Sequence, residues 1–349
     1  MSRTSIVIGV ALVAGAAACN QGIHSDTTTA TETGAGTNDA SEASDASEAA
    51  TDTEGETTAG TDTEGAPQVV RFIAFGDGGE GNEAQYQVAS VVEQVCAERG
   101  CDFAVYLGDN FYDNGVSSVD DTQFQDKFEL PYQDLGFRFY VVLGNHDYGE
   151  VLPDWTKSSY EIEYTQYSDK WYLPAEWYTF TVEHVQFFAL DTHRQMMGET
   201  LQDQRAWMAG EIGSSSAQWK IALAHHPYIS NGAHGNAGTY EGLDTTLLAG
   251  KNVKAFLDDF VCGQANVFFS GHDHTRQWLE PTCGTQFIVS GAAAKTTSFE
   301  HRDNNPVYYE DDQEEGFMWV EIVDDRMTGV FYDRDGNIDF EKSITLGEW

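Results

Sequence analysis

The segment NVFFSGHDH, residues 266–274, joins a short apolar run to a Gly-His-Asp-His sequence. The apolar run is typical of a buried strand, and the polar residues follow where that strand would end. In an extended segment residues two positions apart point the same way, so His272 and His274 would lie on one side. Two imidazoles on one side favour a metal site, although an isolated pair of this kind is more often part of a surface loop.

Apolar runs of the same kind recur along the chain and alternate with helical patterns. Six more strands are predicted at residues 69–75, 103–110, 137–147, 185–191, 219–227 and 285–293. The spacing of apolar residues predicts three helices, over 88–96 with Gly100 able to close it, over 200–212 and over 253–260. The segment 318–333 is typical of a hairpin of two longer strands. Strands that alternate with helices predict a layered α/β domain.

Polar residues that can carry chemistry come directly after these predicted strands. They are Asp77, Asp109, Asn145, His146, His225, His272 and His274. Ligand sites in α/β sheets lie just beyond the carboxyl ends of the strands, so we expect these side chains to meet. Residues of ordinary surface loops would be scattered instead, and the coincidence therefore favours a site.

Five short motifs carry these residues: GDGG (76–79), GDNFYDNG (108–115), GNHD (144–147), AHHP (224–227) and GHDH (271–274). Together they supply carboxylates, an amide oxygen, several imidazoles and a tyrosine. By donor type this set suits two hard or borderline metal ions. The glycines beside the ligands allow sharp turns and a close approach of the backbone.

This order of motifs resembles that of the calcineurin-like metallophosphoesterases. The stretch GDNFYDNGVSSVDDTQFQDKFE (108–129) is similar to the corresponding part of the purple acid phosphatases, in particular their small, tartrate-resistant form. GHDHTRQWLE (271–280) and VSGAAA (289–294) are similar to it as well, and the similarity covers most of residues 69–333. The resemblance implies an α/β fold of the αββα sandwich type, with mixed sheets inside and helices outside.

The resemblance also implies a role for each ligand of the first metal. Tyr112, three residues after Asp109, matches the tyrosinate that binds ferric iron and gives this family its colour. Fe(III) would be held by Asp77, Tyr112 and His274. Asp109 would bridge this ion and the second one.

The second ion, which is Fe(II), Zn(II) or Mn(II) in the family, would be held by Asn145, His225 and His272. His225 and His226 compete for one position in the AHHP motif. The family places its ligand two residues before Pro227, which selects His225 and leaves His226 beside the ligand set.

The implied activity is that of an acid phosphatase, in which a metal-bound hydroxide hydrolyses phosphate monoesters. His146 and His234 match the two histidines of the family that bind no metal, contact the substrate phosphate and can protonate the leaving group. A phosphodiesterase or nucleotidase with the same two metals is an alternative. A non-catalytic surface protein that keeps the metal site is another, although it would have no use for a proton donor.

Two departures from the animal enzymes stand out in the sequence. Gly78 occupies the position of a tryptophan, so an aromatic wall near the site would be missing. The segment 192–200 is shorter than the loop that is cut to activate the animal enzymes, so we expect no proteolytic control. Asp191 is expected to cap or stabilise a strand end, and His193 has no expected role.

Composition limits the class of partner. The chain has 349 residues, 41% of them hydrophobic, and a formal charge of −39. Residues 67–349 alone carry 46 acidic and 17 basic side chains. Because phosphate backbones are bound by Lys and Arg, nucleic acid is excluded as a partner. We expect a monomer that acts on small phosphate esters.

The N-terminal residues predict export. Residues 6–18 form an apolar run of 13 residues that is too short to span a membrane comfortably, so 1–18 is predicted to be a signal peptide. The sequence before Cys19 resembles a bacterial lipobox, with Ala16 where Leu is usual. We expect lipidation of Cys19 as the only membrane contact, at the periplasmic or outer surface of a bacterial envelope; secretion after ordinary cleavage is the alternative.

Residues 20–66 contain 11 acidic residues, no Lys or Arg and no aromatic residue. Such a segment cannot bury enough apolar surface to fold, and 19–66 is predicted to be an anchor cysteine with a disordered acidic spacer. The catalytic domain is predicted over 67–349.

Four further cysteines remain, Cys96, Cys101, Cys262 and Cys283. An exported protein permits disulfides, and four cysteines allow three connectivities. We expect the two local pairs, Cys96–Cys101 and Cys262–Cys283, although the sequence leaves free buried thiols open.

Overall fold

The computed structural model describes residues 66–149, 152–199 and 201–349. The predicted signal peptide, Cys19 and the acidic spacer up to residue 65 lie outside these ranges and stay predictions. Within the described ranges no helix has both the length and the apolar character that a membrane span requires.

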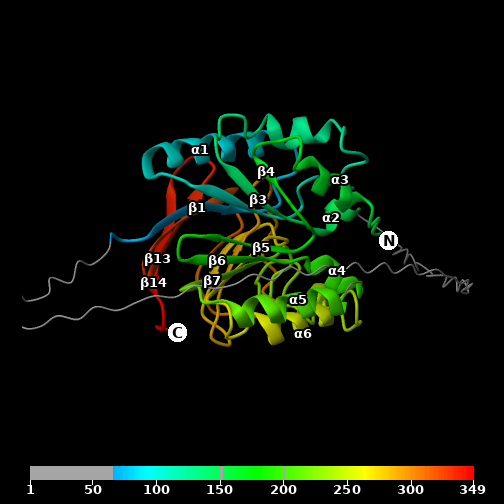
Figure 1. Ribbon diagram of the computed structural model, residues 1–349, viewed down its shortest axis with the longest axis vertical. Coiled ribbons are helices and arrows are strands. Elements are labelled where there is room, and N and C mark those ends of the chain that lie inside the picture. The colour runs from blue at the N-terminus through cyan, green and yellow to red at the C-terminus, as the bar shows by residue number, and fades with distance from the viewer. Residues whose placement is uncertain (1–65, 150–151, 200) are drawn as a thin grey trace, which may run out of the picture. The chain divides into compact units, whose positions relative to one another are not determined.

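Two seven-stranded mixed sheets form the interior of the domain (Figure 1). The first has the order β14-β13-β12-β1-β2-β3-β4, in which β1 to β4 are parallel and β12 to β14 are antiparallel to their neighbours. Its strands are β1 (Val69–Phe75), β2 (Phe103–Leu107), β3 (Arg138–Val142), β4 (Trp171–Tyr172), β12 (Gly316–Val323), β13 (Arg326–Asp333) and β14 (Ile338–Thr345).

The second sheet has the order β11-β9-β10-β8-β7-β6-β5 and a parallel centre made of β10, β8, β7 and β6. Its outer strands β5, β9 and β11 are antiparallel to their neighbours. The strands are β5 (Tyr178–Val182), β6 (Val185–Ala189), β7 (Trp219–Leu223), β8 (Val267–Ser270), β9 (Arg276–Leu279), β10 (Gln286–Ser290) and β11 (Val307–Asp311).

All seven predicted strands and the predicted hairpin are present in the described chain. The sequence missed five strands, β4, β5, β9, β11 and β14, of which all but β9 lie at the edge of a sheet. Edge strands are partly exposed and therefore carry polar residues that weaken the apolar signal. The expected αββα sandwich of mixed sheets is confirmed by this architecture.

Aromatic side chains fill the space between the two sheets. The ring of Phe72 on β1 meets the rings of Phe187 on β6 and Phe269 on β8 edge to face, with centroids 5.5 and 5.9 Å apart. All three residues are fully buried. Because successive residues of a strand point to opposite faces, Phe188 on β6 packs on the outer side with residues of α5 and α6.

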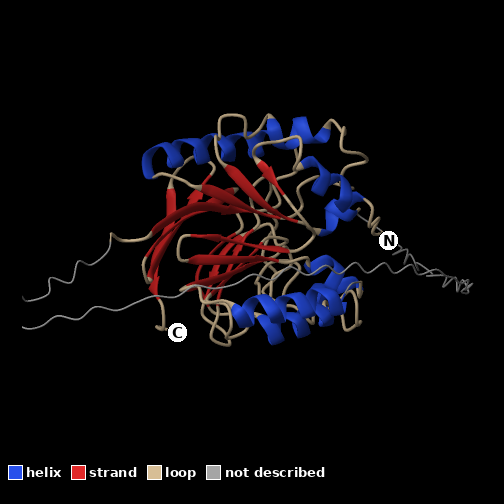
Figure 2. Cartoon of the chain, in the orientation of Figure 1, coloured by secondary structure: helices blue, strands red, loops and turns tan. Residues whose placement is uncertain are grey.

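Helices cover the outer faces of the sandwich (Figure 2). The α1 helix lies over the first sheet, and α5 and α6 lie over the second (Figure 1). The helices are α1 (Glu83–Arg99), α2 (Asn145–Tyr148), α3 (Lys157–Tyr164), α4 (Thr192–Met197), α5 (Leu201–Ser214) and α6 (Lys251–Phe260), with a π-helical turn η1 (Gln125–Glu129) and a 3-10 turn η2 (Tyr240–Gly242).

Capping interactions fix the two ends of α1 and the start of α4. The Asn82 side chain accepts the Gln85 N–H at the start of α1, and Gly100, with a φ of 84°, closes the helix as expected. Asp191 accepts the Arg194 N–H and so caps the helix α4. Asp191 was expected to cap or stabilise a strand end, and it does act as a cap, of the short helix that directly follows β6.

The two sheets are joined by hydrogen bonds at the carboxyl ends of their central strands. The Gly76 N–H after β1 donates to the Ser290 carbonyl of β10 at 2.8 Å. The Ser290 hydroxyl donates to the Ala74 carbonyl at 2.9 Å. We refer to this line of contacts as the seam, and the residues that follow β1, β2, β3, β7 and β8 gather along it.

Both expected disulfides are present in the described chain, Cys96–Cys101 and Cys262–Cys283. The first closes a loop with a sequence separation of 5 and the second one with a separation of 21. The first fastens the end of α1 to the start of β2, and the second fastens the segment after α6 to the turn before β10.

Replacing Cys262 and Cys283 together by Ala should lower the free energy of unfolding by about 3 kcal/mol, because a longer closed loop restricts the unfolded chain more. The matched pair Cys96→Ala and Cys101→Ala should cost about 2 kcal/mol. Urea unfolding of the full chain measures both values. A larger loss from the short loop would contradict the loop-entropy explanation.

Candidate metal centre

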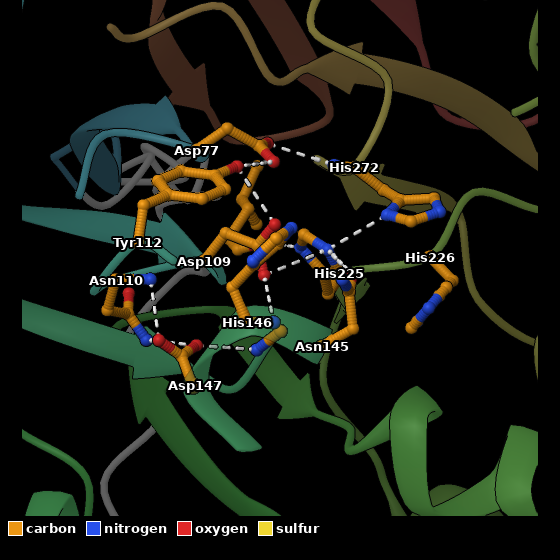
Figure 3. A network of polar contacts seen from close by, with 12 residues as sticks. Asp77, Asp109, Asn110, Tyr112, Asn145, His146, Asp147, His225, His226 and His272 are labelled. Atoms are coloured by element: carbon orange, nitrogen blue, oxygen red, sulfur yellow. Dashed lines mark hydrogen bonds and ion pairs between the residues drawn. The ribbon is translucent and has the colours of Figure 1, made fainter. Parts of the chain in front are cut away.

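All seven residues that were predicted as metal ligands meet along the seam, and Figure 3 labels six of them, all but His274. They come from the ends of five strands: Asp77 after β1, Asp109 and Tyr112 after β2, Asn145 after β3, His225 after β7, and His272 and His274 after β8. The expectation that polar residues at the carboxyl ends of strands lie close together is therefore confirmed.

The Tyr112 hydroxyl lies at the middle of one half of this cluster. Its oxygen is 3.0 Å from Oδ1 of Asp77 and 2.9 Å from Oδ2 of Asp109. Nε2 of His274 lies 3.2 Å from the same oxygen, while Nδ1 of that ring contacts the Thr297 hydroxyl at 3.0 Å. Two carboxylates, a phenol and an imidazole thus face one point.

Nε2 of His225 lies at the middle of the other half. It is 2.9 Å from Oδ1 of Asn145 and 3.1 Å from Nδ1 of His272. Oδ1 of Asp109 lies 3.4 Å from the same nitrogen. Asp109 therefore presents one carboxylate oxygen to each half, which is the geometry that a bridging ligand needs.

The protonation of His225 leaves a metal-binding lone pair directed into the cluster. Its Nδ1 lies 3.0 Å from the Leu107 carbonyl, which can only accept a hydrogen bond, so Nδ1 carries the proton. Nε2 then faces Oδ1 of Asp109 without a proton between them. Backbone carbonyls commonly orient metal-binding histidines in this way, and a cation between these two atoms would stabilise the arrangement.

The charges of the cluster also call for cations. Burial, followed by the charge of Asp109, raises the pKa of Asp77 well above its usual range. Burial and the same two carboxylates raise the pKa of Tyr112. Bound cations reverse this balance and favour the ionised forms. Carboxylates with a phenol in one half, and imidazoles with an amide in the other, fit the two ions that the sequence predicts.

The backbone holds three of the ligands in the left-handed region. The φ angles of Asp77, Asp109 and His272 are 59°, 53° and 69°. The close packing needs glycine beside them, since a Cβ at Gly144 would lie 2.2 Å from Oδ1 of Asp109 and one at Gly271 would lie 2.4 Å from Oδ2 of Asp77. Strain of this kind persists only where the surrounding structure enforces it.

Asp147, which the sequence analysis did not select, supports the ligands from behind (Figure 3). Its carboxylate accepts the backbone N–H groups of Asn110, Phe111 and Gly144 at 2.8, 3.1 and 2.7 Å. It also accepts the side-chain amide of Asn110 at 2.9 Å. Asn110 and Asp147 belong to the motifs GDN and GNHD. Their position close to a predicted ligand in the sequence was the one signal that could have indicated this supporting role.

The two predicted non-ligand histidines lie at the entrance to the cluster, and both are half-buried. The His146 ring lies 4.5 Å from the Tyr112 ring, centroid to centroid, and its backbone N–H donates to Asp109 at 2.9 Å. The His234 ring stacks on His272 with centroids 3.9 Å apart. Glu241, which the sequence analysis missed, pairs with Nδ1 of His234.

Burial by itself would lower the pKa of His234. The hydrogen bond to Glu241 and the charge of Asp273 outweigh it, so the net shift of this pKa is upward. Glu241 and Asp273 thus favour a ring that keeps a proton available at the entrance.

His226 lies beside the ligands without joining them, as expected. Its Nδ1 is 2.9 Å from the Thr192 hydroxyl, and in Figure 3 no dashed line joins its ring to another residue.

Lys295 also lies beside the cluster, although the sequence did not predict it. Its ammonium lies 3.3 Å from the centroid of the Tyr112 ring and pairs with Glu80 at 2.5 Å.

The sequence of this chain is similar to those of known proteins. The sequence profile described as calcineurin-like phosphoesterase matches residues 70–276. Human tartrate-resistant acid phosphatase type 5 is 28% identical over 319 residues, which cover 80% of this chain and 92% of that protein. Purple acid phosphatase 4 of Arabidopsis thaliana is 30% identical over 295 residues, which cover 77% of this chain and 81% of that protein. The chain belongs to the purple acid phosphatases, within the calcineurin-like phosphoesterase family.

A solved structure supports the fold of this purple acid phosphatase. The structure described as "GAP50 the anchor in the inner membrane complex of Plasmodium" superposes with a TM-score of 0.64, at 20% identity, over 80% of this chain and 90% of that one. At that identity the likeness shows the fold alone. The family relatives confirm the expected enzyme class, a metal-dependent phosphatase with a dinuclear site.

The departure at Gly78 has a structural counterpart in this phosphatase. A Cβ at this buried glycine would lie 2.6 Å from the Tyr106 hydroxyl and 2.9 Å from the Tyr132 hydroxyl. These two tyrosines already fill the space beside the GDGG motif. A larger side chain at position 78 is thus excluded by its own neighbours.

Gly271→Ala should weaken metal binding at least about tenfold, because the new methyl group displaces the Asp77 carboxylate and outer-shell disturbances of this kind cost 10- to 100-fold. Metal content after gel filtration of the full chain measures the effect. The matched control is Gly210→Ala on α5, where no atom lies within 4 Å of the new Cβ.

The control should keep its metal and gain about 0.5–1 kcal/mol of stability, because alanine is the better helix residue. Equal metal content in both variants would show that the contact between Gly271 and Asp77 does not hold the ligand in place.

Proposed function

We propose that this chain hydrolyses phosphate monoesters at a dinuclear centre outside the cytoplasm. The observation that carries the proposal is the convergence of seven ligand side chains on two neighbouring points, with two further histidines at the entrance. A protein that only bound metal would not need those two histidines.

The proposed ligand assignment follows the two halves of the cluster. Fe(III) is assigned to Asp77, Tyr112 and His274, because carboxylates and a phenolate suit a trivalent ion. The second ion, Fe(II), Zn(II) or Mn(II), is assigned to Asn145, His225 and His272. Asp109 would hold both ions, since its two oxygens face the two halves. When bound, such ions neutralise phosphate charge and lower the pKa of water to about 7 or below.

The protein's own groups supply the rest of the reaction. The oxygen of a water molecule bonds to phosphorus as the water gives up a proton to solvent, the P–O bond to the leaving group breaks, and the leaving oxygen takes a proton. His146 and His234 lie where they can hold phosphate oxygens by hydrogen bonds and supply that proton. Asp147 and the seam keep the strand ends in place, so little reorganisation is needed during the reaction.

The proposed location rests on the N-terminal sequence and on the disulfides. A signal peptide over 1–18, a lipid on Cys19 and a spacer up to residue 66 would tether the domain to a bacterial envelope. The two disulfides of the described chain favour an oxidising compartment.

Hydrolysis of 4-nitrophenyl phosphate and bis(4-nitrophenyl) phosphate by the full chain, supplied with iron and zinc, tests the activity. We expect a clear preference for the monoester. The control Asp109→Ala should lose more than about a hundredfold in kcat/KM together with most of its metal, because both ions lose a ligand.

Preference for the diester would keep the metal centre and make the chain a phosphodiesterase. No turnover with both metals bound would favour a non-catalytic role, as an anchor such as the Plasmodium structure is described to be. Retained activity and metal in Asp109→Ala would refute the ligand assignment.

Tyr112→Phe should bleach the colour of the iron-loaded protein, since the proposed chromophore is the tyrosinate on Fe(III), and should cost less activity than Asp109→Ala. Visible absorption spectra of the full chain provide the measurement. Tyr106→Phe is the matched control, because Tyr106 is also fully buried but its hydroxyl lies outside the ligand cluster. Unchanged colour in Tyr112→Phe would exclude Tyr112 as the chromophore.

A further inference from the structure

A cavity of about 330 Å³ opens beside the ligand cluster and has no role in the mechanism above. Asn145, His234 and His272 line it on the side of the metal centre. The organic part of an ester whose phosphate is held at the ligands therefore has this cavity next to it.

The outer part of the cavity is apolar. It is lined by Pro153, Met196, Met197, Leu243 and Leu248, with the ring of Tyr240. Leu243 and Leu248 are 37% and 54% exposed, so their apolar surface faces solvent around the opening. Exposed apolar groups gathered at a cavity mark a binding surface, and methionine side chains adapt to the shape of a ligand.

The cavity offers no free cation, because the proton-bearing ring of His234 is already paired with a carboxylate. Among the described residues that line it, none is Lys or Arg. Its one carboxylate, Glu241, is paired with His234. A carboxylate or a second phosphate on the leaving group would lose its water here without gaining an ion pair, which disfavours its binding.

The inner part holds an unpaired polar atom. Nε2 of His226 is buried and has no hydrogen-bond partner among the described residues. The Thr192 hydroxyl accepts the backbone N–H of His226 at 3.1 Å and lies 2.9 Å from Nδ1 of that ring. Nδ1 and the hydroxyl form one hydrogen bond, which leaves Nε2 as the ring atom that a ligand can pair with. Buried polar atoms of this kind are normally satisfied by a ligand or by water.

His193 completes the inner wall. Its ring stacks on that of His226, with centroids 5.8 Å apart, and both of its nitrogens are buried without a described partner. Burial lowers the pKa of His193 to about 3, so the ring adds no charge at neutral pH. His193 had no expected role, because nothing in the sequence around it indicates a cavity.

We propose that this cavity is the leaving-group subsite and that it selects phosphate monoesters of uncharged aryl alcohols. The proposal rests on the monoesterase activity proposed above. The rings of His193, His226 and Tyr240 suit a flat group, the methionines and leucines cover it, and Nε2 of His226 can form one hydrogen bond with a polar atom of that group.

Three esters whose leaving phenols have nearly equal acidity test the selectivity: phenyl, 2-naphthyl and 3-carboxyphenyl phosphate. For the full chain loaded with iron and zinc, kcat/KM should be about tenfold higher for the naphthyl ester than for the phenyl ester, a typical gain for an added apolar group in such a pocket. It should be about tenfold lower for the carboxyphenyl ester. Equal values for the three esters would overturn the proposal.

A charge variant locates the selectivity. Met197→Lys places a cation at the opening and should raise kcat/KM for the carboxyphenyl ester, relative to the phenyl ester, about three- to fivefold. Ile338→Lys is the matched control. Ile338 is 50% exposed on β14, the edge strand of the first sheet, and does not line the cavity. The same change in both variants would assign the effect to net charge and refute the subsite.

Binding of non-hydrolysable phosphonates separates the subsite from the activity. The Kd of 2-naphthylmethylphosphonate should be about tenfold lower than that of methylphosphonate, with a more negative heat-capacity change, since apolar surface is buried. Titration calorimetry measures both. A tenfold difference in Kd without any turnover would support the subsite and refute the proposed phosphatase activity. Turnover with equal Kd values would refute the subsite and support the activity.

Discussion

The seam between the sheets is the constraint on which the site depends. The Gly76 N–H bonds to the Ser290 carbonyl across it, and Nδ1 of His225 reaches the Leu107 carbonyl in the same way. Each sheet by itself would present only part of the ligand set, since Asp77 and Asp109 belong to one sheet and His225 to the other. The aromatic packing between the sheets holds these strand ends at a fixed separation, and the strained backbone at three ligands can persist because the packing enforces it.

The sequence predicted the central strands because they are buried on both faces and read as continuous apolar runs. It also identified all seven residues of the cluster, because each follows such a run within a recognisable motif. The parts that it missed depend on contacts between distant segments. β9 begins with Arg276, which is fully buried because Asp311 and Asp339 of later segments bind its guanidinium at 2.7 and 2.6 Å. His193 and Glu241 acquire their surroundings in the same way, from elements far away in the chain.

An acidic protein with an anionic substrate poses an apparent conflict. The described cluster is itself rich in carboxylates, and ions bound among them would dominate the local field at short range. Residues 67–349 carry 46 acidic and 17 basic side chains, and this net negative charge repels long polyanions. Among the residues that the structure describes, no Lys or Arg lines the cavity to counter this repulsion. Together these features favour small esters with one phosphate and an uncharged remainder.

The pairing of β1 with β12 has a consequence for the order of assembly. Val69 pairs with Val323, so one edge of β1 stays open until nearly the whole chain has been synthesised. Contacts over such a sequence separation form late, because closing a long loop costs entropy before any contact is gained. The end of β1 supplies Asp77, so this ligand is fixed in its final position only late in folding. A metal ion held by Asp77 would therefore be bound after most of the chain has been synthesised.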